Sequence, residues 1–220
     1  MTRLVDPNRQ DSFSNSLRRK RFALFLDLVS DMKGPIRILD VGGTNVFWQN
    51  MNFGVDESSD VKVEITLLNL TTFHVDHSNF KSVTGDARDM KEFGDGEFDI
   101  VFSNSVIEHV GDYSDQARMA NEIRRVSKRY FVQTPNYFFP MEPHTLFPGF
   151  QWLPVGVRTF LLTNFRLGNV LRMPDKDKAR NYVRHIQLLS RRQMKELFPD
   201  SVIHDEKLAG MTKSFISIRK

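Results

Sequence analysis

Short apolar runs alternate with amphipathic stretches along most of this chain. Strands are predicted where the runs are densest, at residues 36–41, 61–70, 80–84, 98–103, 129–134, 202–207 and 214–218. Helical spacing of apolar residues predicts helices at about 15–32, 114–127 and 190–197. This alternation is typical of βα units around a mainly parallel sheet, here closed by a hairpin of the last two strands.

Breaks in the pattern divide the chain. In the first helix the predicted buried stripe is Leu17, Phe22, Phe25, Leu26 and Val29, and Gly34-Pro35 ends it. After the fifth strand, residues 136–165 are rich in Phe, Pro and Trp and continue no βα repeat. We therefore predict one domain over 1–220, with a helical segment at 1–34 and an insertion or lid at 136–189.

Composition narrows the class of protein. The chain has 220 residues, 40% hydrophobic and 26% charged, which is an ordinary globular balance. It has no cysteine, which excludes disulfides, a thiolate nucleophile and cysteine-ligated zinc. The beginning of the chain lacks the apolar run of a signal peptide, and the longest apolar stretch, 22–29, is too short to span a membrane. A soluble, cytoplasmic protein is expected.

The net charge of +4 comes largely from the run at 18–21 and from the segment 172–192. We expect both to be solvated helix faces. Attraction to a phosphate-bearing substrate, a membrane surface or nucleic acid is the alternative.

The first predicted strand leads directly into a glycine turn. Asp40 stands near its carboxyl end, Gly42 and Gly43 follow, and Thr44 and Asn45 come next. Glycines at this place let the backbone approach a ligand, and open α/β sheets bind ligands at the carboxyl ends of their strands. No third glycine follows and no Gly-Lys-Ser/Thr sequence is present, which disfavours a nicotinamide dinucleotide and a phosphate loop.

The next three strands also end in polar or glycine residues. Asn69 could bond ribose hydroxyls, Asp86 could accept from an adenine amine, and Ser103-Asn104 follows the fourth strand. Strand ends are often polar because loops are solvated. Four consecutive strand ends with such residues in this order instead indicate an adenosine-containing ligand lying across the edge of the sheet.

Three of these segments together resemble the class I S-adenosylmethionine-dependent methyltransferases, close to the type 11 small-molecule group. They are Ile-Leu-Asp-Val-Gly-Gly at 38–43, Thr-Gly-Asp-Ala at 84–87 and Phe-Asp-Ile-Val-Phe-Ser-Asn-Ser-Val-Ile-Glu-His-Val at 98–110. The resemblance covers residues 36–135. It implies a Rossmann-like sheet of seven mostly parallel strands, with the last strand antiparallel and helices on both faces.

The resemblance also implies which residues hold the cofactor S-adenosylmethionine. The amino-acid part would be lined by Asp40, Gly42 and Gly43 with Thr44 and Asn45 beside it, the adenine held by Asp86 and Ala87, and the methionine moiety faced by Ser103 and Asn104. Asn69 stands where the family usually has an acidic residue on the ribose. This departure weakens the expected bonds, although an amide can still donate and accept.

For the acceptor, three side chains are candidates for catalysis. His109 lies just past the fourth strand and could serve as a general base or simply pack against the next helix. Glu142 and His144 are held between prolines in the loop after the fifth strand, where they could bind the acceptor, transfer a proton or be structural. These residue types could bind a metal, but no ligand spacing supports one, and no metal site is predicted.

The expected function is methyl transfer to a small-molecule or glycan-type acceptor that the sequence does not identify. The aromatic residues Phe147–Trp152, Phe160 and Phe165 would form either a cover over the site or ordinary core. An RNA methyltransferase is disfavoured because Ser103-Asn104-Ser105-Val106 replaces the Asn-Pro-Pro-aromatic motif. A cofactor-binding module without catalysis is the third alternative.

Overall fold

The computed structural model describes residues 13–55, 62–75 and 77–220, without the side chains of 13–17. It contains one seven-stranded sheet in the order β3-β2-β1-β4-β5-β7-β6. The strands are β1 (Ile36–Val41), β2 (Val63–Asn69), β3 (Phe80–Thr84), β4 (Phe98–Asn104), β5 (Ser127–Pro135), β6 (Val202–Leu208) and β7 (Met211–Arg219). Neighbouring strands from β3 to β5 are parallel, and β7 runs antiparallel to both β5 and β6. The predicted Rossmann-like sheet is confirmed.

The helices lie between these strands and after β5. They are α1 (Phe13–Val29), α2 (Asn45–Met51), α3 (Tyr113–Val126), α4 (Val155–Asn164), α5 (Lys176–His185), α6 (Arg191–Leu197) and the short 3-10 helices η1 (Ile107–His109) and η2 (Phe150–Trp152). The sequence pattern did not predict α2, α4 or α5. Among the described helices none has the length and apolarity needed to cross a membrane.

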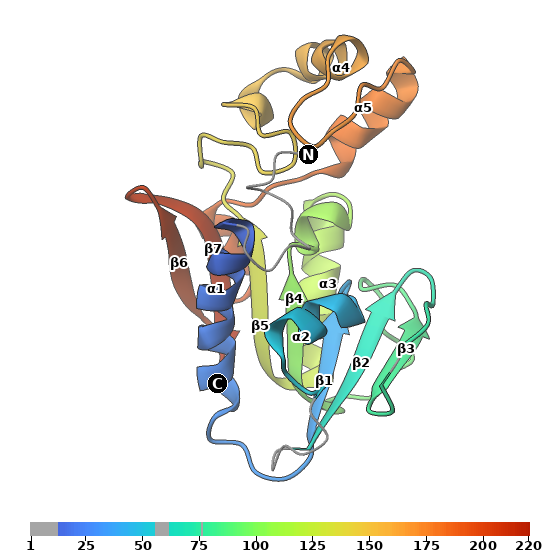
Figure 1. Cartoon of the computed structure of the whole chain (residues 1–220), viewed down its shortest axis with the longest axis vertical. Coiled ribbons are helices and arrows are strands. Elements are labelled where there is room, and N and C mark those ends of the chain that lie inside the picture. The colour runs from blue at the N-terminus through green and yellow to red at the C-terminus, as the bar shows by residue number, and fades with distance from the viewer. Residues whose placement is uncertain (1–12, 56–61, 76) are drawn as a thin grey trace.

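Each face of the sheet is covered by helices, and two apolar cores result (Figure 1). On one face Phe22 and Phe25 of α1 and Trp48 of α2 pack against Phe102 and Phe131 of the sheet. The other core is formed mainly by apolar residues of α3 and α6 against the strands. The first core contains many aromatic rings, which accounts for several of the 19 phenylalanines.

The first helix buries a different stripe from the predicted one. Leu28 is fully buried, whereas Leu26 is 43% exposed. Arg21 belongs to the basic run expected to be solvated, yet only 9% of it is exposed. Its guanidinium donates to both carboxylate oxygens of Glu206 in β6, at 3.1 and 2.9 Å. Arg21 is therefore not solvated as expected, because its hydrogen bonds compensate the burial of its charge. The side chain of Leu17, which belongs to the predicted stripe, and residues 1–12 lie outside the described part of the chain.

The segment after β5 forms a small helical lobe beyond the carboxyl ends of the central strands (Figure 1). Helices α4 and α5 contact one another and share a separate apolar cluster that includes Phe150, Leu162, Ala179 and Val183. Ser190 is the N-cap of helix α6, and its hydroxyl accepts from the Gln193 backbone nitrogen in a capping box.

Candidate active site

The turn after β1 leaves no room for side chains at its two glycines. Gly42 has a φ of +76°, and a Cβ there would lie 2.6 Å from the Val106 side chain. A Cβ at Gly43 would lie 1.8 Å from Oδ2 of Asp40. Both positions therefore require glycine, and the bare backbone of the turn is open to a ligand.

A cavity of about 440 Å³, here called the glycine-loop cavity, lies beside this turn. Its lining residues are Arg18, Asp40, Gly42, Gly43, Thr44, Val46, Phe47, Asn50, Phe102 and Asn104. It therefore joins the carboxyl ends of β1 and β4 with α1 and α2. Five of the ten predicted cofactor residues line it, and Arg18 is an addition that the basic run alone could not assign.

Asp40 lies beneath the turn with only 1% of its surface exposed. Its Oδ2 accepts from the indole Nε1 of Trp48 at 2.7 Å. Burial raises the pKa of the Asp40 carboxyl to about 7, against the opposing effect of the Trp48 hydrogen bond. The carboxyl group can therefore change its charge near neutral pH.

Two predicted cofactor residues, Asn69 and Asn45, do not line the glycine-loop cavity. The Nδ2 of Asn69, at the end of β2, donates to the carbonyl oxygen of Gly43 at 2.8 Å. Asn69 thus connects β2 to the glycine turn, a role that its sequence position did not reveal. Asn45 is buried at the start of α2 and does not line the cavity.

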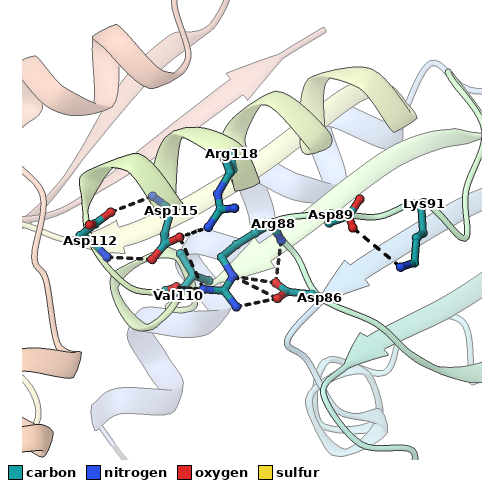
Figure 2. Close-up of polar contacts among 8 residues, drawn as sticks. All are labelled: Asp86, Arg88, Asp89, Lys91, Val110, Asp112, Asp115 and Arg118. Carbon is teal, nitrogen blue, oxygen red and sulfur yellow. Dashed lines mark hydrogen bonds and ion pairs between the residues drawn. The ribbon is translucent and has the colours of Figure 1, made fainter.

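Asp86 forms an ion pair with Arg88, which Figure 2 shows. The Arg88 Nη2 donates to Oδ2 of Asp86 at 2.6 Å, and its Nη1 lies 3.5 Å from a carboxylate oxygen of Asp115 in α3. The hydrogen bond from Arg88 holds the pKa of Asp86 below its usual range. Asp86 therefore stays ionised, and its neighbour Ala87 packs against the core rather than lining the cavity.

The two predicted cofactor residues at the end of β4 lie in different surroundings. Ser103 is fully buried and its Oγ has no hydrogen-bond partner. Asn104 lines the glycine-loop cavity, and its Oδ1 accepts from Nη1 of Arg21. The same Nη1 donates to Oε1 of Gln133 in β5 at 2.8 Å. Arg21 therefore fixes the orientation of Asn104 from below.

The three predicted catalytic residues form one cluster. The Nε2 atoms of His109 and His144 are 3.2 Å apart, and Nδ1 of His144 is 2.6 Å from Oε1 of Glu142. The other oxygen of Glu142 accepts from the backbone nitrogen and hydroxyl of Thr145, at 2.6 and 2.7 Å. His109 follows β4 and His144 follows β5, so the fold brings together side chains 35 residues apart in the sequence.

Charge in this cluster is set by burial and by Glu142. Burial, and secondarily His144 and His185, lower the pKa of His109 to about 4. Although burial opposes it, bonding to Glu142 raises the pKa of His144 and lowers that of Glu142. His109 is therefore neutral at pH 7, with the proton of the His144–Glu142 pair held on the Nδ1 side.

Glu108 is a fourth member that the sequence analysis did not single out. It is fully buried, and its Oε2 accepts from Oγ1 of Thr134 at 2.9 Å. Its Oε1 has no hydrogen-bond partner, and burial raises its pKa to about 7. Adjacency to His109 was the only signal in the sequence, because nothing there reveals that this carboxyl group points inward.

Two further cavities border the segment that carries Glu142 and His144. One of about 520 Å³, the proline-lined cavity, is walled by Pro135, Pro140, Pro143 and Pro148 together with Arg21, Phe139, Met141 and Met211. The other, of about 210 Å³, is the Tyr182 cavity, which Glu142 and Tyr182 line with Tyr137 and Arg158. Of the aromatic residues expected to form a cover or core, Phe150 is buried, whereas Trp152, Phe160 and Phe165 are exposed.

Comparison with known proteins identifies the domain. Residues 50–130 match the family model described as "Methyltransferase domain". This part of the chain, which is less than half of its length, is thus similar to a methyltransferase domain. The resemblance drawn from the sequence is therefore confirmed, and S-adenosylmethionine is the cofactor that such a domain implies.

The relatives found cover the chain unevenly. An uncharacterized protein of Mycobacterium tuberculosis is 38% identical over 53 residues, which is 24% of this chain and 18% of that protein. The chain thus spans less than a fifth of the curated relative it matches. A phosphoethanolamine N-methyltransferase of Haemonchus contortus, solved with S-adenosylmethionine, has a TM-score of 0.53 at 16% identity and is covered to 38%, against 84% of this chain.

A methyltransferase of Aquifex aeolicus described as S-adenosylmethionine-dependent matches over nearly its whole length. Its TM-score is 0.53 at 11% identity, over 94% of this chain and 93% of that one. At these identities the structural likenesses show the fold alone. The likeness in fold thus extends along almost the entire chain.

Proposed function

We propose that this protein is an S-adenosylmethionine-dependent methyltransferase that acts on a small-molecule or glycan-type acceptor in the cytoplasm, a reducing compartment suited to a cysteine-free chain. The observation that carries the proposal is the glycine-loop cavity at the carboxyl edge of β1 and β4, where neither Gly42 nor Gly43 has room for a side chain. Ligands of open α/β sheets bind at this edge. The methyltransferase-domain match supports the same reading.

The cofactor fits the residues around this cavity. When bound, S-adenosylmethionine supplies an electrophilic methyl group. The turn at Gly42 and Gly43 would approach its amino-acid part through bare backbone, with Asp40 beneath and Asn104 opposite. The remaining assignments proposed from the resemblance are Thr44 and Asn45 beside the amino-acid part, Asn69 at the ribose, Asp86 and Ala87 at the adenine, and Ser103 near the methionine moiety.

The proline-lined cavity supports a small acceptor with an apolar body. It has a volume of about 520 Å³, and apolar side chains, four of them prolines, line it together with a smaller number of polar ones. Cavities of this size and character accept small organic ligands. Arg21 lines the proline-lined cavity and also donates to Asn104 of the glycine-loop cavity, so this hydrogen bond connects a wall residue of one cavity with a wall residue of the other. The similar Haemonchus contortus protein is named for a small-molecule acceptor.

His109, Glu142 and His144 would serve the acceptor, either by binding it or by taking up the proton that it loses. Methyl transfer from a sulfonium is an in-line displacement, for which the protein chiefly aligns the reactants and excludes water. A hydroxyl acceptor must also lose its proton, and neutral His109 has a nitrogen that can accept one.

Calorimetric titration with S-adenosylhomocysteine tests the cofactor site. We expect micromolar affinity, about −8 kcal/mol, and about tenfold weaker binding for Asn104→Ala. Asn121→Ala is the matched control, because Asn121 also accepts from an arginine but lies exposed on α3. The proposal would be refuted if neither S-adenosylmethionine nor S-adenosylhomocysteine gave binding heat or a shift in the unfolding temperature.

The acceptor is then sought by measuring S-adenosylhomocysteine production with a panel of small molecules and with RNA. Turnover with an apolar small molecule supports the assignment. Methylation of RNA alone contradicts it.

A further inference from the structure

The histidine cluster has the geometry of a metal site. The Nε2 atoms of His109 and His144 face one another at 3.2 Å. One ligand atom from each of Glu108, His109 and His144 can be chosen so that all three lie within 4.8 Å of one another. Ligands about 2.1 Å from a tetrahedral ion lie about 3.4 Å apart, so the two imidazoles are already at the separation that zinc requires.

The carboxyl group of Glu108 supplies the second observation. It is fully buried, and Thr134 satisfies only Oε2, leaving Oε1 without a hydrogen-bond partner. A buried polar oxygen without a partner is costly, and such atoms often mark the place of a bound water or ion. A cation bound between Glu108 and the two histidines would give Oε1 the partner it lacks.

Glu142 completes the arrangement from behind. Its Oε1 lies 2.6 Å from Nδ1 of His144, which places the proton of that ring on Nδ1 and turns the lone pair of Nε2 toward His109. Backbone and hydroxyl groups of Thr145 hold the other oxygen of Glu142. Histidines that bind metals are commonly oriented by a carboxylate in this way.

We propose that this cluster binds one divalent transition-metal ion, zinc by its donor set, through Nε2 of His109, Nε2 of His144 and a carboxylate oxygen of Glu108. Imidazole and carboxylate donors suit zinc, and three protein ligands leave a fourth position open. Glu142 acts as a positioning residue for His144. With respect to the proposed function, the open position would take an oxygen atom of the acceptor, so the favoured acceptor carries a hydroxyl or carboxyl group; this last step alone rests on methyl transfer.

Zinc titration of the chelator-treated full chain, followed by calorimetry and by metal analysis, tests the site. We expect one zinc per chain, no comparable binding of magnesium, and at least 100-fold weaker zinc binding in His109→Gln and in His144→Ala. Glu142→Gln should weaken it about tenfold. The matched control is His185→Ala, since the exposed His185 ring packs 5.6 Å from that of His109 without belonging to the ligand set.

Thermal unfolding verifies that each variant is folded, and the absorption spectrum of the cobalt-loaded wild type gives a readout that needs no variant. Tetrahedral cobalt bands support the site. Their absence, or zinc binding that the histidine variants leave unchanged, would overturn it and leave Glu142–His144–His109 as a hydrogen-bonded chain. The metal-free protein is also titrated with S-adenosylhomocysteine. This second measurement distinguishes a failure of zinc binding from a failure of the cofactor site.

Discussion

The glycine-loop cavity and the histidine cluster lie along the same carboxyl edge of the sheet but are assembled differently. Most of the cavity wall comes from residues 40–50, where one strand, one turn and one helix follow each other. The cluster joins η1, after β4, to the segment after β5. A site made mostly by one βα unit depends chiefly on local conformation, whereas the cluster depends on the whole sheet placing two loops side by side.

The two regions also differ in how their charges are held. Asp40 is buried with one indole as its hydrogen-bond donor. In the cluster, Glu142 accepts from His144 and from two groups of Thr145. A carboxylate with several donors is stabilised in its charged form, while one with a single donor is not. We therefore expect the charge of Asp40 beside the cavity to change with pH near neutrality, and Glu142 in the cluster to stay ionised.

The connection between α1 and the sheet should give the largest effect. Arg21 and Glu206 are both about nine-tenths buried and paired at 2.9 Å. Arg21→Met leaves the Glu206 carboxylate without its cation, so we expect a loss of about 3–5 kcal/mol in the free energy of unfolding, measured in urea. Arg192→Met, which breaks the exposed pair with Glu196, should cost less than about 0.5 kcal/mol.

A double variant determines what the Arg21 effect means. Arg21→Met combined with Glu206→Gln should recover much of the stability, because no buried charge then remains unpaired. Loss in the double variant equal to that in Arg21→Met would show that packing, and not charge, holds α1 on the sheet.

The buried charge of Asp40 should appear in the pH dependence of stability. Its pKa of about 7 in the folded protein lies above the value of about 3.9 for an unfolded chain, so the folded state binds more protons between these values. Stability from this group is therefore present at low pH and lost as pH rises toward 7, by about 3 kcal/mol between pH 5 and pH 8. Urea unfolding of the wild type and of Asp40→Asn at several pH values measures the difference.

Only the difference between these two proteins isolates Asp40, because ion-paired carboxylates elsewhere titrate in the opposite sense. The pairs at Asp99 and Asp200 are common to both proteins and cancel. Parallel pH profiles would mean that Asp40 is ionised in the folded protein at all of these values.

A methyl group at the glycine turn should weaken cofactor binding in the glycine-loop cavity and leave the histidine cluster unchanged. A Cβ at Gly43 overlaps Asp40, so Gly43→Ala must displace the turn or the carboxylate, and we expect about 100-fold weaker binding of S-adenosylhomocysteine by calorimetry. Gly156→Ala is the control, since a Cβ at that exposed helical position meets nothing within 4 Å. Equal affinity in the two variants would remove the argument that the turn itself contacts the cofactor.

The contrast between the two regions also explains what the sequence could predict. Strands at 36–41 and 80–84 were predicted at their observed bounds. The first is mostly apolar and buried, as parallel strands are, and it ends at a glycine turn. The polar strand ends followed from the same pattern. Helix α5 was not predicted, because its amphipathic face packs against the α4 lobe and its sequence is strongly charged.

Contacts between distant segments could not be predicted in the same way. The bond between Asn69 and the Gly43 carbonyl spans 26 residues, and the Arg21 pair with Glu206 spans 185. Glu108 was overlooked because its inward direction depends on the turn of η1 and on Thr134 of β5. Periodicity locates an element and its buried face, but a side chain's partner on another element depends on register and tertiary packing.

The smallest expected effect separates two roles for Asn69. As the residue at the end of β2, it could bond the ribose, but its Nδ2 already donates to the Gly43 carbonyl at 2.8 Å. Asn69→Asp keeps the shape and removes that donor while adding the charge that the methyltransferase family usually has there. If holding the turn is the main role, binding of S-adenosylhomocysteine should weaken about fivefold, the value of one hydrogen bond of about 1 kcal/mol. Stronger binding in Asn69→Asp would instead assign the residue to the ribose, and the glycine turn would then hold its shape without support from β2.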